Sequence, residues 1–247
     1  MMLRNVEPRP LLTGFAALAL LNVALSFRNL WPTPAVVPAL AVSVEAFALL
    51  LALAAAAALG RAPRQRLRAI IAVALTALVL GRYADVTAAA LFGRPISLYW
   101  DAPHLPQLAL LAGESIGWPA FALVLSLAAA LICAVYRLLR AALAALVAAL
   151  AAARPRRALV LAGVAAIALG TLAERRGFAD DAIAEPVTVG YARQLALAAS
   201  ALAGRTDAAL PPGPRFETNL APLSNADVLL IFVESYGATT YDDDVQR

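Results

Sequence analysis

The sequence predicts a mainly α-helical, polytopic membrane protein, and three observations support this fold class. The 247 residues are 62% hydrophobic and only 15% charged, which is unusual for a soluble domain. Apolar runs of helical length recur along the first 173 residues. All 20 basic residues are arginine, and most lie between those runs. They form no basic face with interleaved aromatic residues, so we expect no nucleic-acid partner, and a single cysteine excludes an internal disulfide.

Five apolar runs are proposed as transmembrane helices: residues 11–27, 35–59, 69–92, 118–136 and 158–173. The first run also has the form of a signal peptide, but its length and the spans that follow favour a retained helix. A further apolar run at 141–153 reaches only about 20 Å at the rise of an α-helix. We therefore interpret it as a continuation of the fourth span or as an interfacial helix.

The positions of the arginines predict the orientation of these spans. Residues 1–10, 60–68 and 137–157 are rich in arginine, whereas residues 28–34 and 93–117 are poor in it. Cytoplasmic loops of membrane proteins carry the excess of basic residues. Strict alternation then places the N-terminus in the cytoplasm and everything after Glu174 outside.

Three charged residues lie inside the predicted spans. Arg82 and Asp85 are three residues apart, so they share a helix face, and Glu45 lies at a similar depth in the preceding span. Unpaired charges at that depth cost several kcal/mol, so we predict a Glu45–Arg82–Asp85 cluster. It is either a structural clamp between helices or a site of substrate or proton handling.

The loop at 93–117 holds the polar residues best placed to meet a lipid headgroup. These are Arg94, Asp101 and His104, and aromatic residues suited to a membrane–water interface lie beside them. Residues 105–111 are expected to form a short interfacial or re-entrant helix.

An external linker at 174–224 follows the predicted membrane domain. Tyr191, Leu195, Ala198 and Leu202 follow helical spacing and predict one amphipathic helix. The proline-rich residues 211–214 mark a linker or a domain boundary.

Residues 225–247 contain a second kind of structural signal. Six consecutive apolar residues, 228–233, predict a buried strand of a parallel sheet, with Glu234 at its carboxyl end, where ligands collect in α/β folds. The stretch from Val228 to Gly237 resembles the opening strand of the alkaline-phosphatase-like domain in membrane-anchored sulfatases, lipoteichoic acid synthases and phosphoethanolamine transferases. The order of five spans, linker and strand is also similar to the lipoteichoic acid synthase-like group.

This resemblance implies that Glu234 coordinates a divalent metal ion, Mn, Mg, Zn or Ca. It implies a hydrolase or transferase that acts on phosphate or sulfate esters at the outer face of a bacterial inner membrane. The partners would be the bilayer and a lipid-linked or envelope glycan substrate. The family's nucleophile and remaining metal ligands lie in later segments, so we expect this chain to be a membrane anchor that is inactive and metal-free by itself. The alternatives are a non-catalytic integral membrane protein and a small transporter that uses Glu45, Arg82 and Asp85.

Overall fold

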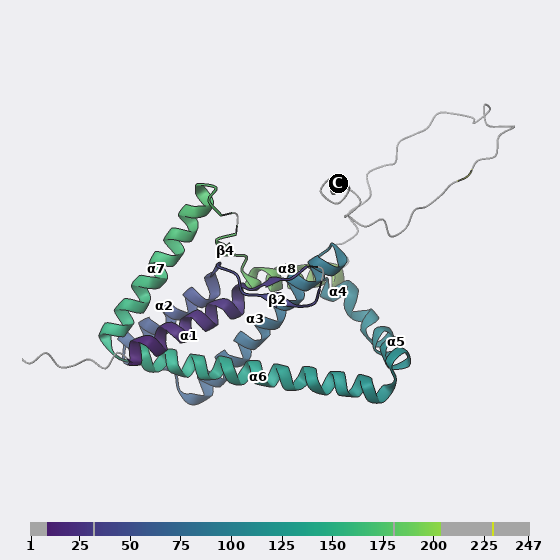
Figure 1. The fold of residues 1–247 in the computed structure, drawn as a ribbon, viewed down its shortest axis with the longest axis horizontal. Helices are drawn as coiled ribbons and strands as arrows, with labels where there is room; N and C mark the ends of the chain where they lie inside the picture. The colour runs from purple at the N-terminus through teal and green to yellow at the C-terminus, as the bar shows by residue number, and fades with distance from the viewer. Residues whose placement is uncertain (1–8, 32, 180, 204–228, 230–247) are drawn as a thin grey trace, which may run out of the picture. The chain divides into compact units, whose positions relative to one another are not determined.

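The computed structural model describes residues 9–31, 33–179, 181–203 and 229. The chain divides into two compact units, residues 1–194 and 195–247. Apart from Leu229, the predicted strand at 228–233 and Glu234 lie outside the described residues, as do residues 211–214. The first unit consists of packed helices with short strands at their connections (Figure 1).

In chain order the elements are α1 (Arg9–Ser26), β1 (Arg28–Asn29), β2 (Val36–Val37), β3 (Val42–Ser43), α2 (Val44–Ala58), α3 (Gln65–Phe92), α4 (Leu98–Asp101), the 3-10 helix η1 (Ala102–His104), α5 (Leu105–Ile116), α6 (Trp118–Leu150), α7 (Ala153–Arg175), β4 (Ile183–Ala184) and α8 (Val187–Leu202).

Three helices in the described part of the chain are long and apolar enough to cross a membrane: α3 with 28 residues, α6 with 33 and α7 with 23. Helices α1 and α2 are apolar but shorter. The 15 residues of α2 extend about 22 Å, against a hydrocarbon core of about 30 Å. The structure therefore supports a membrane protein with three long spans, and the two further spans remain predictions.

Helix α2 begins nine residues later than the sequence predicted. The expected span at 35–59 starts instead with β2 and β3, and the helix begins at Val44. Pro38 lacks the backbone N–H that a helix interior needs. Ser43 then caps α2, because its hydroxyl accepts a hydrogen bond of 3.2 Å from the backbone N–H of Ala46.

The apolar residues after the fourth predicted span continue the same helix. Helix α6 runs without a break from Trp118 to Leu150, so Arg137 and Arg140 lie within it and do not end it. Helix α7 starts at Ala153, five residues before the predicted span, and Pro155 lies in its first turn, where a missing N–H costs little.

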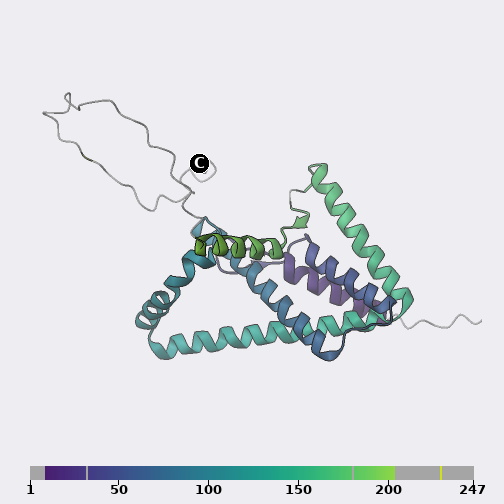
Figure 2. The ribbon, with the colours of Figure 1, turned by 180° about the vertical axis from the view of Figure 1, so that it is seen from behind.

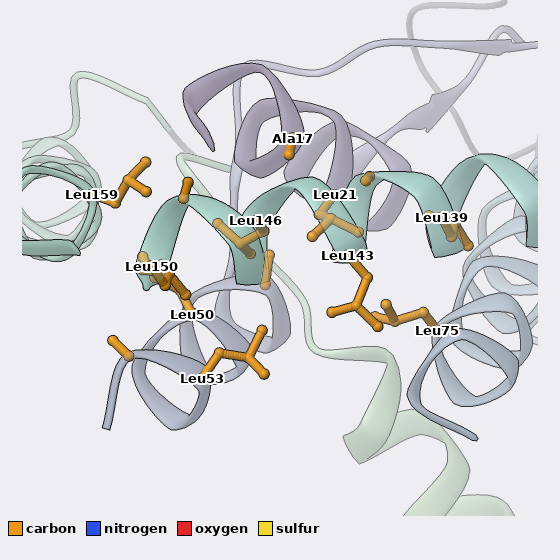
Figure 3. Close-up of a cluster of buried hydrophobic side chains, with 14 of the residues drawn as sticks. Ala17, Leu21, Leu50, Leu53, Leu75, Leu139, Leu143, Leu146, Leu150 and Leu159 are labelled. Carbon is orange, nitrogen blue, oxygen red and sulfur yellow. The ribbon is translucent and has the colours of Figure 1, made fainter. Parts of the chain in front are cut away.

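The core lies along the second half of α6. Leu139, Leu143, Leu146 and Leu150 recur at helical spacing on one face and are fully or almost fully buried. Figure 3 shows this row between leucines of the neighbouring helices, Leu21 of α1, Leu50 and Leu53 of α2, Leu75 of α3 and Leu159 of α7. In Figure 2, the view from behind, α6 again passes α1 and α3, the two helices with which it makes most of its contacts.

Contacts between the connecting segments show which helix ends lie at the same end of the bundle. The segments that follow α1 and α7 meet, because β3 pairs in parallel with β4 and Arg28 forms an ion pair of 3.2 Å with Asp181. At the other end, a Cβ atom on Gly14 near the start of α1 would lie 2.7 Å from the Cβ atom of Ala149 in α6. The carboxyl ends of α1 and α7 therefore share one end of the bundle.

Candidate functional site

Glu45 in the first turn of α2 binds the first turn of α8. One carboxylate oxygen accepts hydrogen bonds from the backbone N–H of Thr188 at 3.1 Å and from its hydroxyl at 3.4 Å. The other accepts a bond of 3.1 Å from the hydroxyl of Ser43. A carboxylate at a helix N-terminus satisfies a free N–H group and is attracted by the helix dipole. Glu45 therefore fixes the start of α8.

Arg82 lies near Glu45 and Asp85 but makes its hydrogen bond elsewhere. Its Nε donates to the backbone oxygen of Phe27 at 3.0 Å. Among the residues that the structure describes, no ion pair within 4.0 Å joins Arg82 to an acidic side chain. Glu45 and Asp85 both lie against the first turn of α8, because Glu45 binds the N–H of Thr188 and a Cβ atom on Gly190 would lie 3.2 Å from a carboxylate oxygen of Asp85. The three predicted charges thus lie in one region without pairing directly.

Helix α8 packs on α3 through two points of close approach. The Tyr191 hydroxyl donates a hydrogen bond of 2.6 Å to the backbone oxygen of Ala77. A Cβ atom on Gly81 would lie 2.6 Å from that hydroxyl oxygen, and one on Gly190 would lie 3.2 Å from a carboxylate oxygen of Asp85. Small residues at such a contact let two helices approach closely. Burial raises the pKa of Tyr191, and the negative charge of Asp85 raises it further.

A third contact ties α8 to the loop after α3. The Gln194 side-chain amide donates to the backbone oxygen of Ile96 at 2.7 Å, and its oxygen accepts from the backbone N–H of Leu98 at 3.1 Å. Thr188, Tyr191 and Gln194 are spaced three residues apart, so they lie on one side of the helix. Tyr191 was predicted only as part of an apolar helix face, and Thr188 and Gln194 were not predicted, although their polar spacing is visible in the sequence.

The predicted headgroup contacts at 93–104 bind one another. The Arg94 guanidinium donates to both carboxylate oxygens of Asp101, at 2.7 and 3.0 Å. These bonds, with a bond of 2.7 Å from the Ser97 backbone N–H, lower the pKa of Asp101 to about 2, and the pairing raises the pKa of Arg94. His104 is exposed, and its side chain makes no hydrogen bond with residues in the described ranges. The pair therefore orders the loop around the capped helix α4.

The contacts described above position helices. In the part of the chain that the structure covers, no group of three His, Cys, Asp or Glu side chains could hold a metal ion. Glu234, the ligand that the resemblance implies, lies outside that part.

Comparison of the chain with protein-family models, with curated proteins and with solved structures gives no match.

Proposed function

We propose that this chain is a membrane anchor that holds α8, and the segment bearing Glu234, outside the membrane. In this proposal the anchored part belongs to a sulfatase-like hydrolase or transferase that acts on phosphate or sulfate esters. The observation that carries the anchoring role is the attachment of α8 to the helical bundle by Glu45, Tyr191 and Gln194. The enzymatic part rests on the resemblance of residues 228–237.

The grouping of the helix ends supports the orientation. Since the carboxyl ends of α1 and α7 share one end of the bundle, the connections after both helices leave on the same side. The opposite end contains the connection at 59–64 between α2 and α3, and the turn between α6 and α7. Residues 54–68 and 150–157 include seven arginines and no acidic residue. By the positive-inside rule this arginine-rich end is cytoplasmic, so α8 is outside.

The contacts of α8 argue against a loosely attached helix. Its first turn is bound by a carboxylate from α2, its middle by a backbone oxygen of α3, and Gln194 by the loop that follows α3. Three contacts to three separate segments define both the position and the rotation of the helix up to Gln194.

The alternative of a small transporter finds less support. A carrier residue must exchange partners during transport, but both carboxylate oxygens of Glu45 are engaged with Ser43 and Thr188. Arg82 is bound to a backbone oxygen. These hydrogen bonds favour the structural clamp over a role in substrate or proton handling.

The enzymatic part is tested in membranes from cells that express the gene at its own locus. The measurement is hydrolysis of bis(p-nitrophenyl) phosphate with Mn²⁺ added and after chelation. If Glu234 binds the metal, Glu234→Ala lowers the metal-dependent rate by at least about a hundredfold, because metal binding supplies several kcal/mol of transition-state stabilisation. Glu114→Ala, which changes an exposed acidic residue of α5, is the matched control and leaves the rate unchanged. A rate that is independent of Glu234 would refute the enzymatic proposal and leave the anchoring role intact.

A further inference from the structure

A groove lies between α2 and α7 at the end of the bundle opposite α8. Its volume is about 410 Å³, and it is lined by Ala54, Val160 and Leu161 together with the side chains of Arg156 and Arg157. The groove thus combines an apolar wall with two cationic side chains from the start of α7.

The arginines beside this groove have no acidic partner in the part of the chain that the structure describes. Neither Arg154, Arg156 nor Arg157 forms an ion pair with any residue in the described ranges, and the first turn of α7 contains no acidic residue. Arg156 donates one long hydrogen bond of 3.4 Å to the backbone oxygen of Leu150. Because a helix N-terminus carries a partial positive charge, cations there are unfavourable and a bound anion relieves the repulsion.

Residues 54–68 and 150–157, which surround this end of α2 and α7, contain no acidic side chain that could serve as that anion. The seven arginines at 54–68 and 150–157 face no Asp or Glu within those segments. One of them, Arg68, also has a buried Nε without a hydrogen-bond partner in the described part of the chain. The positive charge at this end is therefore not compensated within these segments and would attract an anion.

We infer that the groove binds an anionic phospholipid of the bilayer. The phosphate group lies against Arg156 and Arg157, and an acyl chain lies along Ala54, Val160 and Leu161. A soluble anion would satisfy the arginines but would leave the apolar wall uncovered. Basic pockets between membrane helices on the cytoplasmic side suit such headgroups, and α7 is long and apolar enough to cross a bilayer. This inference requires membrane insertion but no enzymatic activity.

The test measures which lipids stay with the purified protein. The full chain is inserted into nanodiscs of phosphatidylcholine and phosphatidylglycerol in equal amounts, extracted with mild detergent, and its retained lipids are quantified by mass spectrometry. The wild type retains phosphatidylglycerol in preference to phosphatidylcholine. Arg156→Gln with Arg157→Gln reduces that preference by about thirtyfold, the factor expected for two arginines near a membrane surface. The control Arg175→Gln with Arg176→Gln, at the exposed far end of the same helix, leaves it unchanged.

A second variant tests the groove without changing the arginines, in case the Arg156→Gln, Arg157→Gln double variant fails to fold. Leu161→Glu keeps all the arginines and places a carboxylate on the exposed side of the groove wall, so it should also lower phosphatidylglycerol retention. Equal retention of the two lipids by the wild type would overturn the inference. So would equal losses in the two arginine double variants, or complete displacement of phosphatidylglycerol by inorganic phosphate alone.

Discussion

The carboxylate of Glu45 accepts a hydrogen bond of 3.1 Å from the backbone N–H of Thr188, across 143 positions of the sequence. Glu45 lies in the first turn of α2 and Thr188 in the first turn of α8. This side chain is one of three, with Tyr191 and Gln194, that attach α8 to the helical bundle. The charged side chain of Glu45, in the otherwise apolar helix α2, thus has Thr188 as its structural partner.

Glu45→Ala is expected to destabilise the protein by about 1–3 kcal/mol, because the N–H of Thr188 loses a charged acceptor. Thr188→Pro removes that N–H from a first-turn position that tolerates proline, and Thr188→Val is the control that keeps it. In the Thr188→Pro background, Glu45→Ala should cost at least about 0.5 kcal/mol less. The free energy of unfolding is measured in mixed detergent micelles.

The same measurement separates this clamp from direct pairing with Arg82. Since no ion pair joins the two side chains, Glu45→Ala and Arg82→Gln should show a smaller coupling energy than Glu45→Ala and Thr188→Pro. A larger coupling with Arg82 would contradict the clamp.

Tyr191 is expected to ionise late in an alkaline titration. Burial and the nearby carboxylate of Asp85 raise its pKa above 10, so its contribution to stability is complete below pH 10 and is lost as the pH rises through the higher value. Ultraviolet absorbance should show a late-titrating phenolate in the folded protein that is absent from Tyr191→Phe. Asp85→Asn should shift this ionisation to lower pH. An unchanged titration in Tyr191→Phe would refute the contact.

The pair of Arg94 and Asp101 should order its loop down to strongly acidic pH. The pKa of Asp101 is lowered to about 2 by Arg94 and the Ser97 backbone N–H. The pair's contribution to loop stability is therefore complete above about pH 4 and is lost as the pH falls toward about 2. Fluorescence of the neighbouring Trp100 should report this transition. In Arg94→Gln the midpoint should move upward, and an identical midpoint in both proteins would contradict the pairing.

Gly163 tests the packing of α7 on α2. A Cβ atom there would lie 2.9–3.0 Å from side-chain atoms of Leu50 and Phe47, so Gly163→Leu should destabilise the protein by about 1–3 kcal/mol. Ala165→Leu adds a similar volume on an exposed position of the same helix and should have little effect. Thermal unfolding in detergent compares the two, and equal melting temperatures would contradict this packing.

Helix boundaries marked by local chemistry could be predicted from the sequence. The predicted ends of the second and third spans lie within one residue of those of α2 and α3, since Gly60 and Gly93 follow them in the left-handed conformation that glycine adopts readily. The predicted start of α2 was too early, because residues 35–42 are also apolar and are continuous with the helix in a hydropathy pattern. Pro38 and the capping residue Ser43 determine the observed start. The continuity of α6 was left open, because Arg137 and Arg140 resemble loop residues in a hydropathy pattern.

The candidate site was less predictable because its contacts depend on tertiary structure. The sequence identified Glu45 as anomalous and placed Arg82 and Asp85 near it, but nothing local indicates that Thr188 binds its carboxylate. Arg94 and Asp101 were identified as polar residues at an interface, and their mutual pairing depends on the turn that Ser97 caps. Glu234 and its strand remain predictions.

The most direct test of the anchoring role is the side of the membrane on which each end of the bundle lies. Cys133→Ser removes the single cysteine, and Ala62→Cys or Phe178→Cys then places one exposed cysteine in the arginine-rich connection or in the segment after α7. Each protein is treated with a membrane-impermeant maleimide in right-side-out and in inside-out vesicles. We predict labelling of the Phe178→Cys protein only in right-side-out vesicles and of the Ala62→Cys protein only in inside-out vesicles. The reverse pattern, or labelling of both positions from the same side, would contradict it.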